Sequence, residues 1–217
     1  MLRTMVGYVG VAVWLFGGVT PTGHGPIELT IDAPASRVVI LVGKAGVLSF
    51  AGHAHEVVAP AVSGRVTFDP ADWQRASVSL EFDASAMKVT GKDEPAGNVP
   101  EVQKVMLSAK VLDVARNPTI GFQSRGVVVT VLTTTSASVA IDGDITLHGT
   151  TRPMTIRAAV TLDAAGGVTA RGSFTLKQTE FGMVPVRAAG GTIRVKDELD
   201  IRFALVARPA NEPSSTW

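Results

Sequence analysis

The chain contains no cysteine among its 217 residues. This absence excludes disulfide bonds, thiolate metal sites and a cysteine nucleophile. It does not identify the compartment, because disulfide-free proteins occur in oxidising and reducing surroundings alike.

The sequence also lacks an excess of charge of either sign and has few aromatic residues. Its 20 Lys and Arg residues against 19 Asp and Glu give a formal net charge of +1, without a run of like charge. A nucleic-acid partner is therefore not expected. Aromatic residues make up only 6% of the chain, whereas hydrophobic residues make up 46%. This mainly aliphatic composition and the length favour one domain with a sizeable core.

Residues 1–25 have the layout of a secretory signal peptide. Arg3 precedes an uncharged apolar run from Met5 to Val19, and small and turn-forming residues follow. The run is short for a membrane span of roughly 20 residues. We therefore expect a periplasmic or secreted protein, with a folded domain over residues 26–208 and a flexible tail over residues 209–217.

Most of the remaining chain alternates apolar and polar residues with a period of two, which predicts strands with one buried face. Val78, Leu80 and Phe82 illustrate the pattern, since polar residues separate them. Similar stretches predict hairpins around residues 148–153 and 163–167.

One stretch, residues 98–117, breaks this pattern and predicts a short helix or two. Asn98 suits an N-cap, Pro100 a first turn, and Glu101 complements the helix dipole, before apolar residues recur at helical spacing. Many short strands with tight turns and one helical insertion predict an all-β fold, an extended antiparallel barrel.

Four segments, in this order, resemble the YceI-like family of secreted lipid-binding proteins. They are SGRVTFDP at 63–70, VLDVARNPTIGFQS at 111–124, GDITLHGTTRPMTI at 143–156 and TEFGMVPV at 179–186. The resemblance implies a lipocalin-like barrel that binds, without enzymatic activity, a polyisoprenoid, isoprenoid quinone or fatty chain for storage, transport or protection in the cell envelope.

In such a barrel the inward residues of the predicted strands are the candidates for lining a lipid cavity, and no cofactor would be required. The segment around Lys92, Asp93 and Glu94 departs from the family's acidic helix start, and we expect it near the barrel mouth. The cavity-lining candidates are Val78, Leu80, Phe82, Ile120, Phe122, Ile141, Ile145, Leu147, Ile156, Ala158, Val160, Phe174, Leu176, Ile201 and Phe203.

Four histidines are the remaining candidates for chemistry. In a regular strand His53 and His55 point the same way and are candidates for a ligand head group, whereas Glu56 points to the other face. A metal or redox site on these two histidines needs further donors, and no metal site is expected. We expect His148 to form a hydrogen bond that stabilises its turn.

No sequence motif for catalysis is present: the chain lacks a serine nucleophile elbow, a phosphate loop and an HExxH helix. Asp142 and Asp144 share a strand face with the spacing of a carboxylate pair, but a solvated outer face explains them better. A barrel filled by side chains that binds a protein partner is a second alternative. Transient membrane contact and a homodimer stay open.

Overall fold

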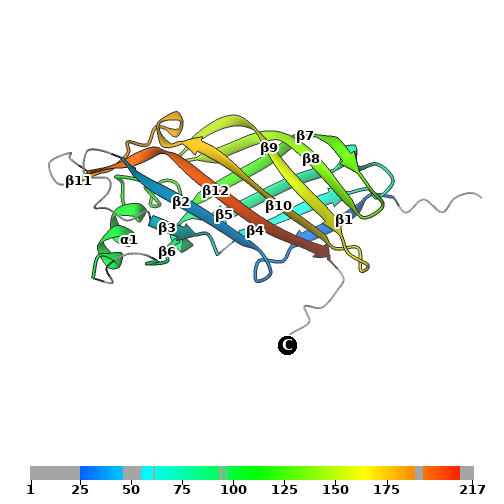
Figure 1. Ribbon diagram of the computed structural model, residues 1–217, viewed down its shortest axis with the longest axis horizontal. Helices are drawn as coiled ribbons and strands as arrows, with labels where there is room; N and C mark the ends of the chain where they lie inside the picture. Colours follow the sequence, from blue (N-terminus) through cyan, green and yellow to red (C-terminus); the bar gives the residue numbers. More distant parts are fainter. Residues whose placement is uncertain are drawn as a thin grey trace, which may run out of the picture.

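The computed structural model describes residues 25–45, 55–60, 62–92, 95, 97–188 and 193–210. Within these residues a twelve-stranded antiparallel sheet closes into an elongated barrel, with one α-helix, α1 (Val99–Leu107), at one end (Figure 1). The strands are β1 (Ile27–Ile31), β2 (Arg37–Ala45), β3 (His55–Val58), β4 (Val62–Phe68), β5 (Ser77–Asp83), β6 (Lys88–Val89), β7 (Thr119–Leu132), β8 (Ser136–Leu147), β9 (Thr150–Leu162), β10 (Val168–Lys177), β11 (Arg187–Ala188) and β12 (Ile193–Pro209).

Eight strands form the closed wall of the barrel, in the order β1, β4, β5, β7, β8, β9, β10 and β12. The wall closes where β12 pairs with β1, with Leu29 opposite Pro209 and Ile31 opposite Ala207. Every pairing is antiparallel, as the short connections between successive strands require. The predicted fold class is therefore confirmed, and closure leaves the wall without a free edge at this seam.

Three pairs of short strands lengthen one side of this wall. β1 and β2 both run antiparallel to β12 and so act as one long strand, interrupted at residues 32–36. β4 pairs with β1 and β3 pairs with β2, so β4 and β3 together form the next long strand. In the same way β5 pairs with β4 and β6 pairs with β3. The extension carries β3 and β6 to the end of the barrel where α1 lies (Figure 1), which we call the α1 end.

The single helix occupies the start of the predicted helical region. Asn98 is the N-cap residue, although its side chain forms no capping hydrogen bond, and Pro100 lies in the first turn. After Leu107 the chain continues to Asn117 through hydrogen-bonded turns. The prediction of one or two helices is thus met by one.

The β8–β9 hairpin confirms a predicted turn but shortens it. His148 and Gly149 form a two-residue turn with φ angles of 51° and 73°, the conformation that two-residue hairpins favour. Pro153, expected in the connection, instead lies within β9. Pro153 is tolerated there because β10 pairs with β9 only from Ala158 to Leu162, so the nitrogen of Pro153 faces no third strand.

The end of the barrel opposite α1 is packed by aromatic side chains. Phe68 at the end of β4 and Trp73 in the 3-10 helix η2 (Trp73–Arg75) are both buried. Their rings meet edge to face, with centroids 4.9 Å apart. Such an edge-to-face pair favours a single well-packed arrangement at this end.

Gly64 in β4 is expected to tolerate no side chain. Its φ is 150°, and a Cβ atom there would lie 2.1 Å from the backbone oxygen of Ser79 in β5. We expect Gly64→Ala to lower the free energy of unfolding by at least about 1–3 kcal/mol, measured by urea denaturation. Gly126→Ala in β7 is the matched control, because a Cβ atom there meets nothing within 4 Å. Equal stability of the two variants would contradict the expectation.

Candidate functional site

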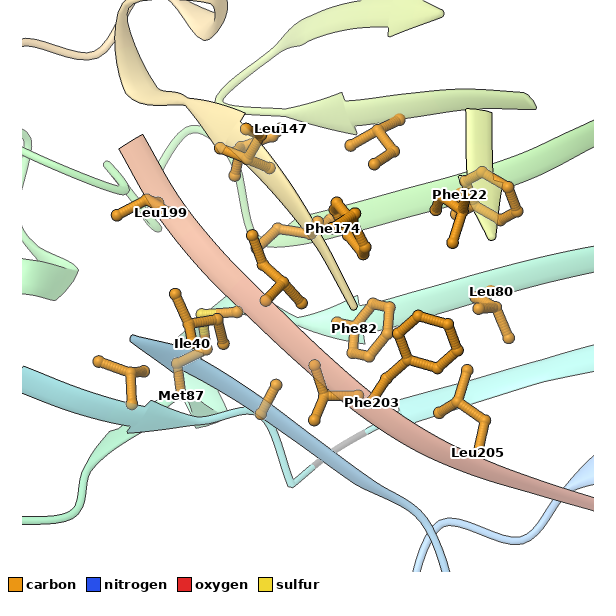
Figure 2. A pocket seen from close by; sticks show the side chains of 18 of the residues that line it. Ile40, Leu80, Phe82, Met87, Phe122, Leu147, Phe174, Leu199, Phe203 and Leu205 are labelled. Carbon is orange, nitrogen blue, oxygen red and sulfur yellow. The ribbon is translucent and has the colours of Figure 1, made fainter. Parts of the chain in front are cut away.

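The barrel encloses a cavity of about 650 Å³. Side chains from every wall strand and from α1 line it. In Figure 2 the labelled side chains, among them Phe82, Phe174 and Phe203 from three different strands, project into the enclosed space. Phe174 and Phe203 lie with ring centroids 6.3 Å apart. The interior is hollow, so the alternative of a barrel filled by its own side chains is wrong.

Fourteen of the fifteen predicted candidates line this cavity. The exception is Ala158, which is buried at 6% exposure but does not reach the cavity. Its methyl group is shorter than the side chain of Val139, its cross-strand partner, which does line the cavity. Whether the fourteen residues contact a ligand stays a prediction.

Sequence reasoning missed the lining residues contributed by β2 and α1. The run Val38–Val42 is apolar at every position, so alternation could not say which residues face inward. In α1 the helical spacing was visible, but only the tertiary structure shows that this face covers the cavity. The lining residues missed in these two elements include Val38, Ile40, Val42, Val102, Val105 and Met106.

The polar lining residues lie toward the α1 end. Lys44 is near the end of β2, His55 begins β3, and Glu101 lies in the first turn of α1. Asn98, the N-cap of α1, also lines the cavity here. In the segment that we expected near the barrel mouth, Asp93 and Glu94 lie outside the described residues. The cavity thus has an apolar body and a polar end.

Gln178 adds a polar group to this lining. It is only 4% exposed and opens the 3-10 helix η4 (Gln178–Phe181). Its Nε2 donates a hydrogen bond of 2.7 Å to the backbone oxygen of Lys196. This bond fixes the side chain between η4 and β12.

The predicted histidine pair can be placed only in part. His55 is half-buried and lines the cavity, whereas His53 lies outside the described residues. Glu56 points away from the cavity, as expected, with its carboxylate 3.6 Å from Lys92 Nζ. Among the described residues no three His, Asp or Glu side chains converge on a point where a metal ion could bind.

His148 and the aspartate pair each contact a neighbouring segment of the barrel. His148 Nδ1 lies 3.3 Å from the backbone oxygen of Phe181, so its hydrogen bond links the turn to η4 rather than stabilising the turn from within. Asp142 accepts a hydrogen bond from Thr155, and Asp144 lies 3.5 Å from Arg125. Both carboxylates are on the outer face of β8.

The segment η4 covers an opening in the barrel wall. β10 pairs with β9 only from Ala158 to Leu162. The edge of β9 that faces β10 therefore has no strand partner over its N-terminal half. η4 lies over this opening, where Arg152 Nε in β9 donates a hydrogen bond of 2.9 Å to the backbone oxygen of Glu180. Phe181 is fully buried, and Met183 is 3% exposed and lines the cavity. Side-chain packing therefore replaces strand pairing in this part of the wall.

Asp197 in β12 anchors the start of η4. Its carboxylate accepts a 2.7 Å hydrogen bond from Thr179 Oγ1 and a 2.9 Å bond from the Thr179 backbone nitrogen. These bonds, with the side-chain bond as the larger cause, lower the pKa of Asp197 below its usual value. The stabilisation is therefore complete above the unfolded-state pKa of about 3.9 and is lost as the pH falls through the lower folded-state pKa.

We accordingly expect Asp197→Ala to reduce hydrogen-exchange protection of the Gly182 and Met183 amides at neutral pH. Both amides donate to backbone oxygens within η4. The wild-type protein should lose the same protection only below about pH 3.9. Asp163→Ala in the β9–β10 turn is the control and should leave these two amides protected. Unchanged protection in Asp197→Ala would contradict the anchoring role.

No helix in the described part of the chain is long and apolar enough to cross a membrane. The family model of the YceI-like domain matches residues 29–207. Proteins named UPF0312 from Pseudomonas savastanoi pv. phaseolicola and Pseudomonas syringae pv. tomato are each 30% identical over 145 residues, which cover 64% of this chain and 67% of theirs.

Solved structures show the same fold. The crystal structure of Burkholderia cenocepacia BcnA aligns with a TM-score of 0.61 at 19% identity, covering 81% of this chain and 98% of that one. A polyisoprenoid binding domain from Saccharophagus degradans, implicated in plant cell wall breakdown, aligns with a TM-score of 0.60 at 13% identity, covering 84% and 99%. At such identities the likeness establishes the fold alone.

Proposed function

The chain belongs to the YceI-like family, and from this membership together with the cavity we propose that it binds one long apolar lipid inside the barrel. The ligand class is a polyisoprenoid, an isoprenoid quinone or a fatty chain. The protein is a binding protein rather than an enzyme, and it stores, transports or protects the lipid in the periplasm or outside the cell. The name of the Saccharophagus degradans neighbour, a polyisoprenoid binding domain, supports this ligand class.

The observation that carries the proposal is the apolar character of the cavity over its length. Its volume of about 650 Å³ falls within the range of about 300–1,000 Å³ that small-molecule sites occupy. Aliphatic and phenylalanine side chains form its wall from the buried Phe68–Trp73 pair to α1. Each methylene-sized unit buried there gains about 0.8 kcal/mol, so a long chain binds tightly without polar contacts.

The uneven placement of polar groups gives the ligand a direction. An apolar tail occupies the body of the cavity, and a polar end group lies at the α1 end beside Lys44, His55 and Glu101. Lys44 and His55 supply hydrogen-bond donors there, which suit an acceptor such as a quinone carbonyl. The proposal thus includes His55, one of the two head-group candidates from the sequence.

Lipid extraction and native mass spectrometry of the protein purified from its own cell envelope test the proposal. We expect a stoichiometric apolar ligand, whose mass defines the class of chain. Protein that carries no such ligand, and that binds none when incubated with polyisoprenoid or fatty chains, would rule the proposal out. Elemental analysis of the same sample addresses the metal-site alternative directly.

A further inference from the structure

Four exposed arginines lie on adjacent strands of the outer barrel surface. Arg157, Arg171, Arg202 and Arg37 belong to β9, β10, β12 and β2, which run side by side (Figure 1). Ala204 in β12 lies between Arg171 on β10 and Arg37 on β2. Arg202 lies opposite Ser173, which is the next outward-facing residue after Arg171 on β10. The four side chains therefore alternate between two neighbouring rows of the sheet, and we call them the arginine belt.

The arginine belt has no partner of opposite charge among the described residues. None of its four members is within ion-pair distance of a carboxylate, whereas Arg65, Lys92 and Arg116 elsewhere each have one. On the belt's own face Asp142 accepts a hydrogen bond from Thr155, and Asp200 lies two residues before Arg202 without pairing to it. The local charge is thus positive, although the whole chain is nearly neutral.

Small side chains beside the belt leave the guanidinium groups accessible. Arg157 and Arg171 border a shallow surface groove of about 400 Å³ that crosses β8, β9 and β10. Besides Thr130 and Val139, its lining consists of alanine, serine and glycine residues, including Ala140, Ala159 and Ser173. A bulky anionic group such as a phosphate can therefore approach both arginines without displacing a large side chain.

Exposed aliphatic side chains lie on the next strand along. Val128 and Val131 in β7 are 51% and 59% exposed. Val128 pairs with Ala140 and Val131 pairs with Ser138, and both of these partners in β8 line the groove. Exposed apolar groups beside unpaired arginines are the combination by which peripheral proteins bind anionic membrane surfaces.

We propose that this outer face docks the barrel on a bilayer that contains anionic phospholipids. The arginine belt binds headgroup phosphates, and Val128 and Val131 enter the interfacial region. The inference is independent of the proposed cavity ligand, because all the residues involved are on the outside of the wall. It places the protein on the membrane with the barrel lying on its side.

Sedimentation with phosphatidylcholine vesicles, with and without phosphatidylglycerol, tests the proposal. We expect binding only to the anionic vesicles, weakened by salt. The triple variant Arg157→Gln, Arg171→Gln and Arg202→Gln should bind about 5-fold less tightly per arginine, roughly 100-fold in total. The control triple Arg65→Gln, Lys92→Gln and Arg116→Gln removes the same charge from ion-paired positions and should retain most of the affinity.

A second pair of variants tests the apolar contribution. Val128→Ser with Val131→Ser should lower vesicle binding several-fold, whereas Val184→Ser, which alters a side chain 72% exposed elsewhere, should not. Equal loss in the two charge triples would overturn the proposal, as would equal binding to neutral vesicles. If the wild type binds inorganic phosphate through the belt but no vesicles, the belt is an ion site and the membrane proposal is wrong.

Discussion

Replacing Ala170 by Trp is expected to lower the amount of apolar lipid carried by the protein at least about tenfold. Ala170 in β10 lines the cavity, and its cross-strand partners Val160 and Leu205 line it as well. An indole at this position projects into the space that the chain of the ligand would occupy. Displacing only two methylene-sized groups from the wall removes about 1.6 kcal/mol of binding free energy. Lipid extraction and mass spectrometry measure the loss.

Thr161→Trp is the matched control for this variant. Thr161 lies in β9, in the same hairpin, but its side chain is exposed on the outer face. The control should carry as much lipid as the wild-type protein. A folded Ala170→Trp variant with the wild-type amount of lipid would show that the ligand does not run through this part of the cavity. Circular dichroism establishes that both variants are folded.

Phe181→Ala should be the most destabilising single truncation in the segment that covers the wall opening. The Phe181 side chain is fully buried beside the part of β9 that does not pair with β10. Removing a buried phenyl ring leaves a cavity and typically lowers the free energy of unfolding by about 3–5 kcal/mol. Urea denaturation of the lipid-free protein measures this change.

Val184→Ala controls for effects of changing this segment at all. Val184 is close in sequence, but its side chain is 72% exposed, and its truncation should alter stability by less than about 0.5 kcal/mol. If Phe181→Ala costs under about 1 kcal/mol, the segment is not part of the structural core. Side-chain packing would then not be what closes the wall between β9 and β10.

Much of the fold was predictable because strand alternation is a local property. Val78, Leu80 and Phe82 share a face whatever β5 pairs with, and polar residues between them mark the other face. The same reasoning placed Ile141 and Ile145 inside. It failed at Ala158, where the direction was right but the side chain is too short to reach the cavity.

Other features could not be read from local patterns. The apolar run of β2 has no alternation, so its inner face became visible only from pairing with β12. The role of η4 depends on where the pairing between β9 and β10 ends. That point is set by the curvature of the sheet and cannot be predicted from a short segment. The arginine belt unites Arg37 with Arg202, residues far apart in the sequence, and depends on the register between their strands.

By itself the sequence determined the all-β class, two of the hairpins, the helix start near Asn98 and the aliphatic character of the inner faces. These depend on the period of the chain and on its capping and turn residues, which act over a few positions. Only the tertiary structure decided that the interior is hollow, that polar groups gather at the α1 end and that η4 covers an opening. Those features depend on register and closure between distant strands, which set how far each side chain lies from the one across the barrel.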